Sequence, residues 1–221
     1  MGVLSMSIAG TVYALGIENL ALEQQLEIMR QFAIRCILDV RNISEIKEFS
    51  RTEMKEYFYI NQVHYRDYSA LLSMDVSERR FLTSQGYMDF KKYAESLACK
   101  EALDKIGRGV TRGYNCCILG FWADPKRCHR TFLAGHELLQ RGIDMIHITA
   151  QGWLPQSQIE QAVVEENFPS IDQLALFDVP KTPYEDKLSE SLKKANKTIG
   201  QQWLSERSEN SGRQGSKYGW Q

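Results

Sequence analysis

Short apolar runs alternate with longer segments of helical periodicity along most of the chain. The short runs end at glycine or charged residues and predict strands at 11–15, 36–40, 62–65, 114–119 and 143–148. Apolar residues at helical spacing predict helices at 22–33, 52–59, 87–106, 128–141 and 156–166. Asn19 is the expected N-cap of the first helix, and Gly107 the expected stop of the third. This alternation predicts a three-layer, Rossmann-like α/β domain with a mostly parallel sheet of about five strands.

The residues after about position 178 differ in composition from the rest of the chain. Aliphatic residues become sparse there, and Lys, Ser, Asn, Gln and Gly dominate. We therefore expect an α/β domain over residues 8–178 and a polar C-terminal tail over 179–221, helical at 184–204 or disordered. Roughly the last fifteen residues are expected to lack fixed structure. The basic side chains of this tail either contact phosphate groups or are simply solvated, and both interpretations stay open.

Composition and charge are those of a globular protein. Twenty-seven basic and 28 acidic residues exclude a uniformly basic surface for nucleic acid, although a local patch remains compatible with the sequence. No apolar run approaches the ~18 residues of a membrane span, and the N-terminal segment lacks the charged start of a secretory signal. The five cysteines are an odd number without a C-x-x-C pair. We expect reduced thiols, a cytoplasmic location, no membrane contact, no metal and no cofactor.

The carboxyl ends of the predicted strands define the candidate site, because ligands of such sheets bind in the crevice beyond those ends. The residues expected at this edge are Gly16, Ile17, Asp39, Arg41, Tyr65, Arg66, the loop 120–130 and His147. The order of the strands decides which of them are in contact, and the pattern does not give that order.

The loop 120–130, with the sequence GFWADPKRCHR, is the most informative segment. Asp124-Pro125 is a turn signal, and a helix is predicted to begin near Cys128. The free N–H groups and the positive end of that helix suit an anion, and Lys126, Arg127 and Arg130 add cationic donors. The Cys128 thiol is expected to be more acidic than usual in this setting. We predict an anion-binding loop; the alternative is that Cys128 packs under the sheet, His129 bonds a carbonyl and the cations are solvated.

Three side chains at this edge are candidates for acid–base catalysis, namely Asp39, Asp124 and His129. The matching candidates for anion binding are Arg41, Arg130, Lys126 and Cys128. The expected substrate is a phosphate-bearing or nucleotide-like molecule, or nucleic acid. A structural ion pair between Asp39 and a neighbouring arginine is the competing interpretation.

Two motifs carry a resemblance to a known family. The segment from Asp124-Pro125 to Cys128-His129-Arg130 resembles the Cys-x-Glu-x-Asp-Pro-x-x-Cys-His-Arg signature of domain-of-unknown-function family 488. The Asp39–Arg41 segment resembles the family's Asp-Val-Arg strand, and the resemblance extends over about residues 8–165. It implies a fold and a site, but no reaction. The chain is a divergent member, because its departures from the family pattern are Gly120, Trp122, Ile17-Glu18 and Asn42-Ile43-Ser44-Glu45.

Cysteine-based and metal-based functions fit the sequence poorly. A rhodanese-type sulfur transferase needs a cysteine directly after a central strand, where Gly120 stands, and no cysteine has the Cys-x5-Arg spacing of a phosphatase. Cys128 and His129 are adjacent and cannot easily bind one zinc ion. His136, on an apolar helical face, is expected to be a core histidine.

A short peptide at the end of the predicted domain suggests a protein partner. Its residues Gln173, Leu174, Leu176 and Phe177 resemble the Gln-Leu-x-Leu-Phe peptide that binds the bacterial sliding clamp. The two final apolar side chains would fill a pocket while the glutamine orients the peptide. Alternatively, these residues fold back onto the sheet.

Two hypotheses follow from the sequence. The first is an enzyme, or a degenerate enzyme, that acts on nucleic acid or a nucleotide in an anion-binding crevice. The second is a non-catalytic binding or adaptor protein, linked to DNA-processing partners through the peptide at 173–177.

Overall fold

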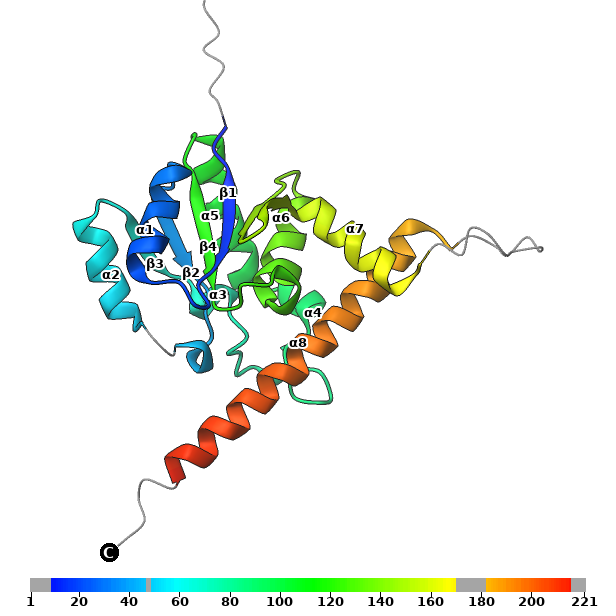
Figure 1. Cartoon of the computed structure of the whole chain (residues 1–221). Helices are drawn as coiled ribbons and strands as arrows, with labels where there is room; N and C mark the ends of the chain where they lie inside the picture. Colours follow the sequence, from blue (N-terminus) through cyan, green and yellow to red (C-terminus); the bar gives the residue numbers. More distant parts are fainter. Residues whose placement is uncertain (1–8, 47–48, 170–181, 216–221) are drawn as a thin grey trace, which may run out of the picture.

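Six strands form one sheet in the order β3-β2-β4-β1-β5-β6 (Figure 1). This computed structural model describes residues 9–46, 49–169 and 182–215. The strands are β1 (Val12–Gly16), β2 (Cys36–Asp39), β3 (His64–Asp67), β4 (Cys116–Gly120), β5 (Ile146–Thr149) and β6 (Gly152–Pro155). Strands β1 to β5 run parallel to one another, whereas the edge strand β6 is antiparallel to β5. The predicted α/β class with a mostly parallel sheet is therefore confirmed.

The edge strand β6 is the one strand that the pattern did not predict. Its residues are exposed or half-buried, with Trp153 63% and Leu154 41% exposed. A strand that buries neither face shows no apolar run, so its sequence resembles that of a loop.

Helices cover both faces of the sheet. The helices are α1 (Leu22–Gln31), α2 (Arg51–Ile60), α3 (Ser69–Leu72), α4 (Phe90–Ala94), α5 (Leu97–Thr111), α6 (His136–Gln140), α7 (Gln156–Asn167) and α8 (Tyr184–Gly215). Shorter helical turns are η1 (Ile43–Glu45), η2 (Arg79–Phe81), η3 (Pro125–Arg127) and the π-helical η4 (Arg130–Gly135). Met29 of α1 and Phe58 of α2 bury apolar side chains on one face, while α3 to α7 lie on the other side of the sheet (Figure 1).

Two predicted helix boundaries are wrong. The N-cap of α1 is Ala21, whose N–H donates to the Gln24 side chain, because Asn19 adopts a positive φ of 63° in the preceding turn. The helix predicted at 87–106 is divided at Ser96, which caps α5, and α5 then continues through Gly107. A glycine inside a helix costs only about 1 kcal/mol, which the burial of Ile106 and Val110 outweighs.

The segment predicted as one helix at 128–141 is irregular at its start. Residues 125–127 form the turn η3, and Arg130–Gly135 are π-helical before α6 begins. All six residues of η4 are buried. A regular α-helical N-terminus, on which the predicted anion loop depended, is therefore not formed at Cys128.

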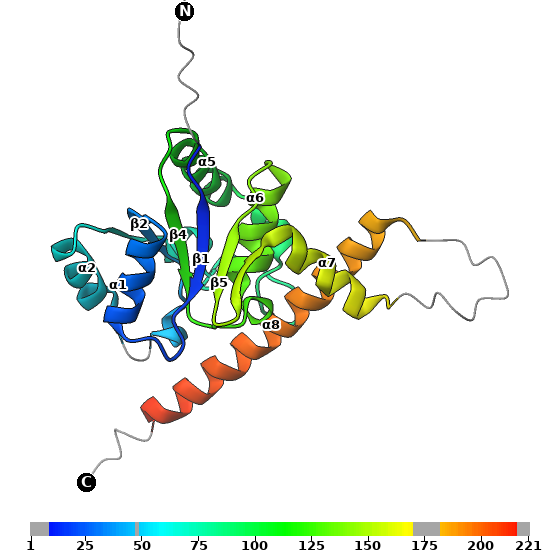
Figure 2. The same cartoon turned by 45° about the horizontal axis from the view of Figure 1, so that its top comes forward.

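The long helix α8 lies across the edge of the domain at which the parallel strands end (Figures 1 and 2). It contacts α7, η1, η3 and η4, and it buries Ile199 and Trp203. The helix begins at Tyr184, where the sequence predicted one, and continues to Gly215, beyond the predicted end at residue 204. The domain boundary expected near residue 178 lies outside the described residues.

Candidate functional site

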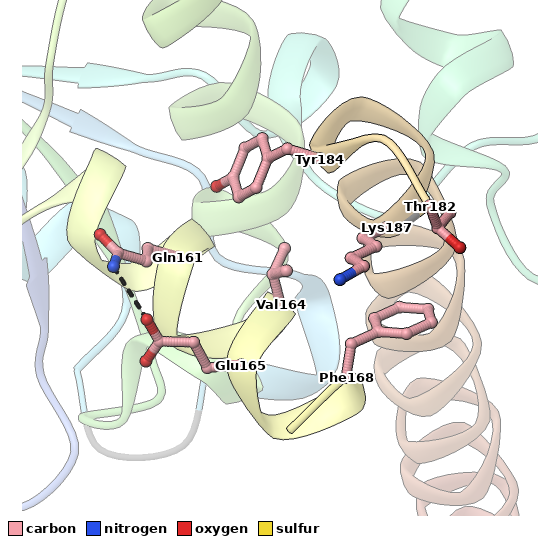
Figure 3. A pocket seen from close by; sticks show the side chains of 7 residues that line it. All are labelled: Gln161, Val164, Glu165, Phe168, Thr182, Tyr184 and Lys187. Atoms are coloured by element: carbon pink, nitrogen blue, oxygen red, sulfur yellow. Dashed lines mark hydrogen bonds between the residues drawn. The ribbon is translucent and has the colours of Figure 1, made fainter. Parts of the chain in front are cut away.

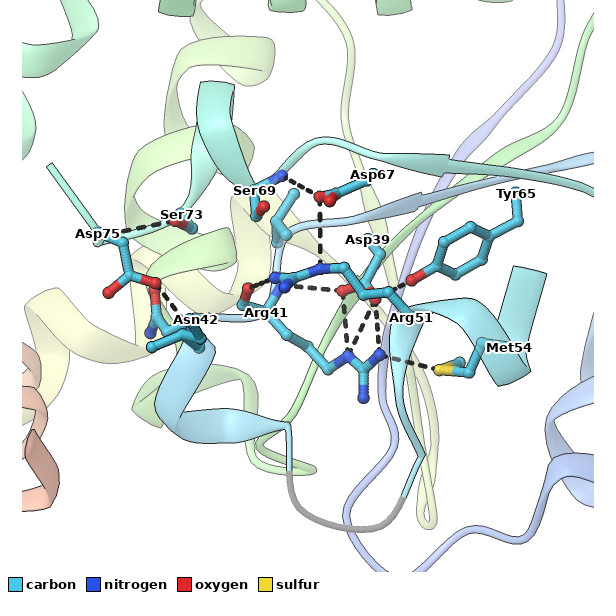
Figure 4. Close-up of polar contacts among 12 residues, drawn as sticks. Asp39, Arg41, Asn42, Arg51, Met54, Tyr65, Asp67, Ser69, Ser73 and Asp75 are labelled. Carbon is cyan, nitrogen blue, oxygen red and sulfur yellow. Dashed lines mark hydrogen bonds and ion pairs between the residues drawn. The ribbon is translucent and has the colours of Figure 1, made fainter. Parts of the chain in front are cut away.

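Asp39 and Arg41 form a closed ion pair at the end of β2 (Figure 4). The Asp39 carboxylate accepts hydrogen bonds from the Arg41 backbone N–H at 2.9 Å, from Arg41 Nη2 at 2.7 Å and from the Tyr65 hydroxyl. Arg41 Nη1 donates to the carbonyl of Phe49 at 3.1 Å. Burial and the Asp39 charge raise the pKa of Tyr65, so its hydroxyl stays a donor. Both members of the pair are satisfied within the chain, which favours a structural role for them.

His129 lies at the same edge and is buried as a neutral side chain. Its Nε2 is 3.0 Å from the carbonyl oxygen of Val40, to which it donates, and its Nδ1 is 4.0 Å from Cys128 Sγ. Burial lowers the pKa of His129. The segments after β2 and β4, whose contact the sequence left open, are thus adjacent in the structure.

Glu45 is a buried carboxylic acid that sequence analysis missed. It accepts the Asn42 backbone N–H at 2.7 Å and lines a cavity together with His129. Burial raises the pKa of Glu45 to about 7, against an opposing effect of His129. Asn42 and Glu45 have the three-residue spacing of a capping box, and this signal could have identified the carboxylate as a local hydrogen-bond partner.

Arg130 is as buried as Arg41, but its three guanidinium nitrogens have no hydrogen-bond partner among the described residues. The side chain packs where β4 ends. A Cβ atom at Gly120 would lie 2.8 Å from Arg130 Nη1 and 2.9 Å from Cys128 Sγ. Gly120, which stands where the family signature has cysteine, therefore provides the space for this guanidinium.

Three other residues of the predicted loop, Asp124, Lys126 and Arg127, have partners of their own. Asp124 is exposed and caps η3 by accepting the Lys126 N–H at 2.9 Å, and Lys126 Nζ pairs with Glu166. The guanidinium of Arg127 stacks on Trp122 at 4.1 Å. The catalytic role of Asp124 and the anion-binding roles of Lys126 and Cys128 stay predictions.

A small cavity lies between this edge and α8. The residues that line it are Asn42, Glu45, Met74, Trp122, Arg127 and His129, with Ile199, Gln202, Trp203 and Glu206 from α8. Its volume is about 10 Å³, close to what one water molecule needs. Helix α8 therefore closes this cavity, and Arg130 is not among the residues that line it.

A larger hollow of about 370 Å³ lies elsewhere, between α7 and the start of α8 (Figure 3). Its lining residues are Gln161, Val164, Glu165, Phe168, Thr182, Tyr184 and Lys187. None of the predicted site residues that the structure describes lines this hollow.

Other predictions concern metals, membranes and partners. In the described part of the chain, no group of three or more His, Cys, Asp or Glu side chains is arranged to hold a metal ion. The described helices include none with the length and apolarity to cross a bilayer. The predicted clamp-binding residues Gln173, Leu174, Leu176 and Phe177 lie outside the described residues.

Comparison with known proteins gives a family but no function. No curated protein and no solved structure matches the chain. The family model "Domain of unknown function DUF488" matches residues 21–136, just over half of the 221 residues. That range contains Asp39, Glu45, His129 and Arg130, whereas β5, β6, α7 and α8 follow it. The chain therefore belongs to the DUF488 family, as its two motifs predicted.

Proposed function

We propose that this protein binds a small phosphate-bearing molecule, or a related oxoanion, in its interior, with the Arg130 guanidinium as the counter-ion. The single observation that carries the proposal is the state of Arg130, which is buried without a hydrogen-bond partner among the described residues. A buried charge is costly unless it is paired and hydrogen-bonded. An anion from outside the chain would meet both needs.

The neighbouring carboxylates do not supply this partner. Asp39 is occupied by Arg41 and Tyr65, and Glu45 accepts from the Asn42 N–H. The planar guanidinium offers several donors that match the oxygens of a phosphate group. The same edge of the sheet is where ligands of α/β domains bind.

Glu45 and His129 give the site a capacity for proton transfer. A carboxylic acid with a pKa of about 7 exchanges its proton readily near neutral pH, and His129 faces the same cavity. Glu45 thus replaces Asp39 as the stronger acid–base candidate, which keeps an enzymatic role within the proposal. The full burial of Arg130 favours a small-molecule ligand over a nucleic-acid strand. Ligand entry would need the covering structure to move, and α8 is part of that cover because it contacts η4, which contains Arg130.

The proposal is tested by measuring thermal unfolding of the full chain with increasing inorganic phosphate. We expect phosphate to raise the Tm of the wild type, because a ligand that binds only the folded state stabilises it. The variant Arg130→Met should lose this response. It should also be at least as stable as the wild type without phosphate, because it removes an unpaired buried charge.

Arg108→Met is the matched control, since Arg108 is exposed on α5. This control should retain the phosphate response. A wild type that does not respond to phosphate, or an Arg130→Met variant that responds as the wild type does, would contradict the proposal.

A second role, binding of the bacterial sliding clamp, rests on the sequence peptide at 173–177. It is independent of the anion site. Its test is direct binding of a purified clamp to the full chain, with Phe177→Ala as the variant and Phe168→Ala as the control. Equal binding by the wild type and Phe177→Ala would exclude this role.

A further inference from the structure

His147 is a buried histidine on β5, on the sheet face that Arg130 covers. It pairs in register with Ala14 of β1, and Gly16, two residues further along β1, pairs with Gly120. Because side chains alternate along a strand, His147, Ala14 and Gly120 belong to the same face of the sheet. Burial and the charge of Arg130 together lower the pKa of His147 to about 3. The two side chains are therefore electrostatic neighbours, and His147 is neutral.

Gln156 fixes which ring nitrogen of His147 carries the proton. The Gln156 amide nitrogen donates to the carbonyl of Thr131 at 3.1 Å and to Glu160 Oε1 at 2.9 Å. The amide oxygen must then be the atom facing His147, and it lies 2.7 Å from Nε2. An amide oxygen is only an acceptor, so His147 Nε2 carries the hydrogen and Nδ1 has a free lone pair.

His147 Nδ1 is thus a buried acceptor without a hydrogen-bond partner among the described residues. Arg130, whose donors are also unpaired among the described residues, packs on the same face of the sheet, and Gln156 links His147 to the carbonyl of Thr131, the residue next to Arg130. A fully ionised oxoanion satisfies the guanidinium but places oxygen lone pairs against the lone pair of Nδ1. An oxoanion that also carries an O–H group satisfies both.

We propose, on the basis of the anion site proposed above, that its ligand is a protonated oxoanion of the hydrogen phosphate class, recognised by Arg130 through its charged oxygens and by His147 Nδ1 through its O–H group. Gln156 acts as a positioning residue, because it holds His147 in the tautomer that accepts this hydrogen. Sulfate is the natural comparison, since it has the same shape and charge type but no hydrogen at neutral pH.

The experiment compares inorganic phosphate and sulfate by isothermal titration calorimetry at pH 7 with the full chain. We expect the wild type to bind phosphate at least roughly tenfold more tightly than sulfate, which corresponds to one unsatisfied buried polar group. His147→Phe should weaken phosphate binding to the level of sulfate and leave sulfate binding unchanged.

A measurement on the wild type does not depend on folding of that variant. Phosphate should shift the ¹⁵N resonance of His147 Nδ1 as it accepts a hydrogen bond, whereas sulfate should not. Equal, Arg130-dependent binding of both anions would overturn the role of His147 and leave the anion site intact. Binding of neither anion would overturn both proposals.

Discussion

Two arginines of this protein are equally buried and have opposite surroundings. Arg41 and Arg130 are each 1% exposed, and they follow the adjacent strands β2 and β4. Arg41 is held by Asp39 and by the carbonyl of Phe49, whereas the guanidinium of Arg130 has no partner among the described residues. Burial alone therefore does not distinguish a structural arginine from a ligand-binding one; the inventory of donors and acceptors does.

The comparison also separates the two family motifs by role. The Asp-Val-Arg motif contains its own acid and base and closes on itself within three residues. The Asp124-to-Arg130 motif ends in a cation whose partner the described chain does not provide. We infer that the first motif holds the edge of the sheet together and that the second one carries binding.

The largest expected effect comes from breaking the closed pair. Asp39→Asn leaves the Arg41 charge buried without its carboxylate and should lower the free energy of unfolding by about 3–5 kcal/mol. Urea denaturation measures this loss. Arg130→Met, by contrast, should not destabilise the protein in phosphate-free buffer.

Asp104→Asn is the control for that substitution, because Asp104 is exposed on α5 and should change stability little. If Arg130→Met lowers the free energy of unfolding as much as Asp39→Asn does, Arg130 is a structural residue like Arg41. The distinction between the two arginines would then be wrong.

A smaller effect is expected from Glu45, through the pH dependence of stability. Its pKa rises from 4.5 to about 7 on folding, so the native state binds more protons than the unfolded state between these values. Stability should therefore fall as pH rises from 4.5 to about 7, by up to about 3 kcal/mol in total. Glu45→Gln should remove this component.

His129 contributes the opposite slope, because its pKa is lowered from 6.5 and its stabilisation is lost as pH falls below that value. The difference in unfolding free energy between the wild type and Glu45→Gln, measured as a function of pH, isolates the contribution of Glu45 ionisation to stability. A difference that stays constant from pH 5 to 8 would mean that Glu45 is ionised throughout; exposed Glu209→Gln is the control.

The smallest effect on stability should come from uncovering the cavity. Trp203→Ala removes a buried α8 side chain from the cavity wall and should lower the free energy of unfolding by about 2 kcal/mol. This value is below the usual one for a buried tryptophan because we expect α8 to open locally before the domain unfolds. Phosphate association, followed by stopped-flow fluorescence, should become faster.

Trp153→Ala, which removes an exposed tryptophan from β6, is the matched control for that kinetic measurement. Unchanged association rates in Trp203→Ala would show that the ligand does not enter past α8.

The sequence predicted the parallel strands and the edge at which the site lies, because buried strands are marked by continuous apolar runs and parallel strands end at one edge. It placed Asp39, Arg41, His129 and Arg130 at that edge. It offered both a catalytic Asp39 and an Asp39 paired with a neighbouring arginine, and it could not decide between them because the pairing depends on side-chain geometry.

The partners that complete the site were not predictable from local pattern. Trp203 reaches the cavity from a helix far along the chain, and Gln156 sets the tautomer of His147 from α7. Such contacts depend on how the helices pack on the sheet, and the spacing of motifs along the chain does not predict that packing.

Gly120 and the buried position of Arg130 are linked by the space at the end of β4. A side chain at this position and the present rotamer of Arg130 cannot occupy the same space, because its first carbon would lie only 2.8 Å from the guanidinium. A cysteine in place of Gly120 would have to displace the Arg130 guanidinium or the Cys128 thiol, whose sulfur is 2.9 Å from the same point. The glycine at the end of β4 and the buried arginine of this chain therefore depend on one another.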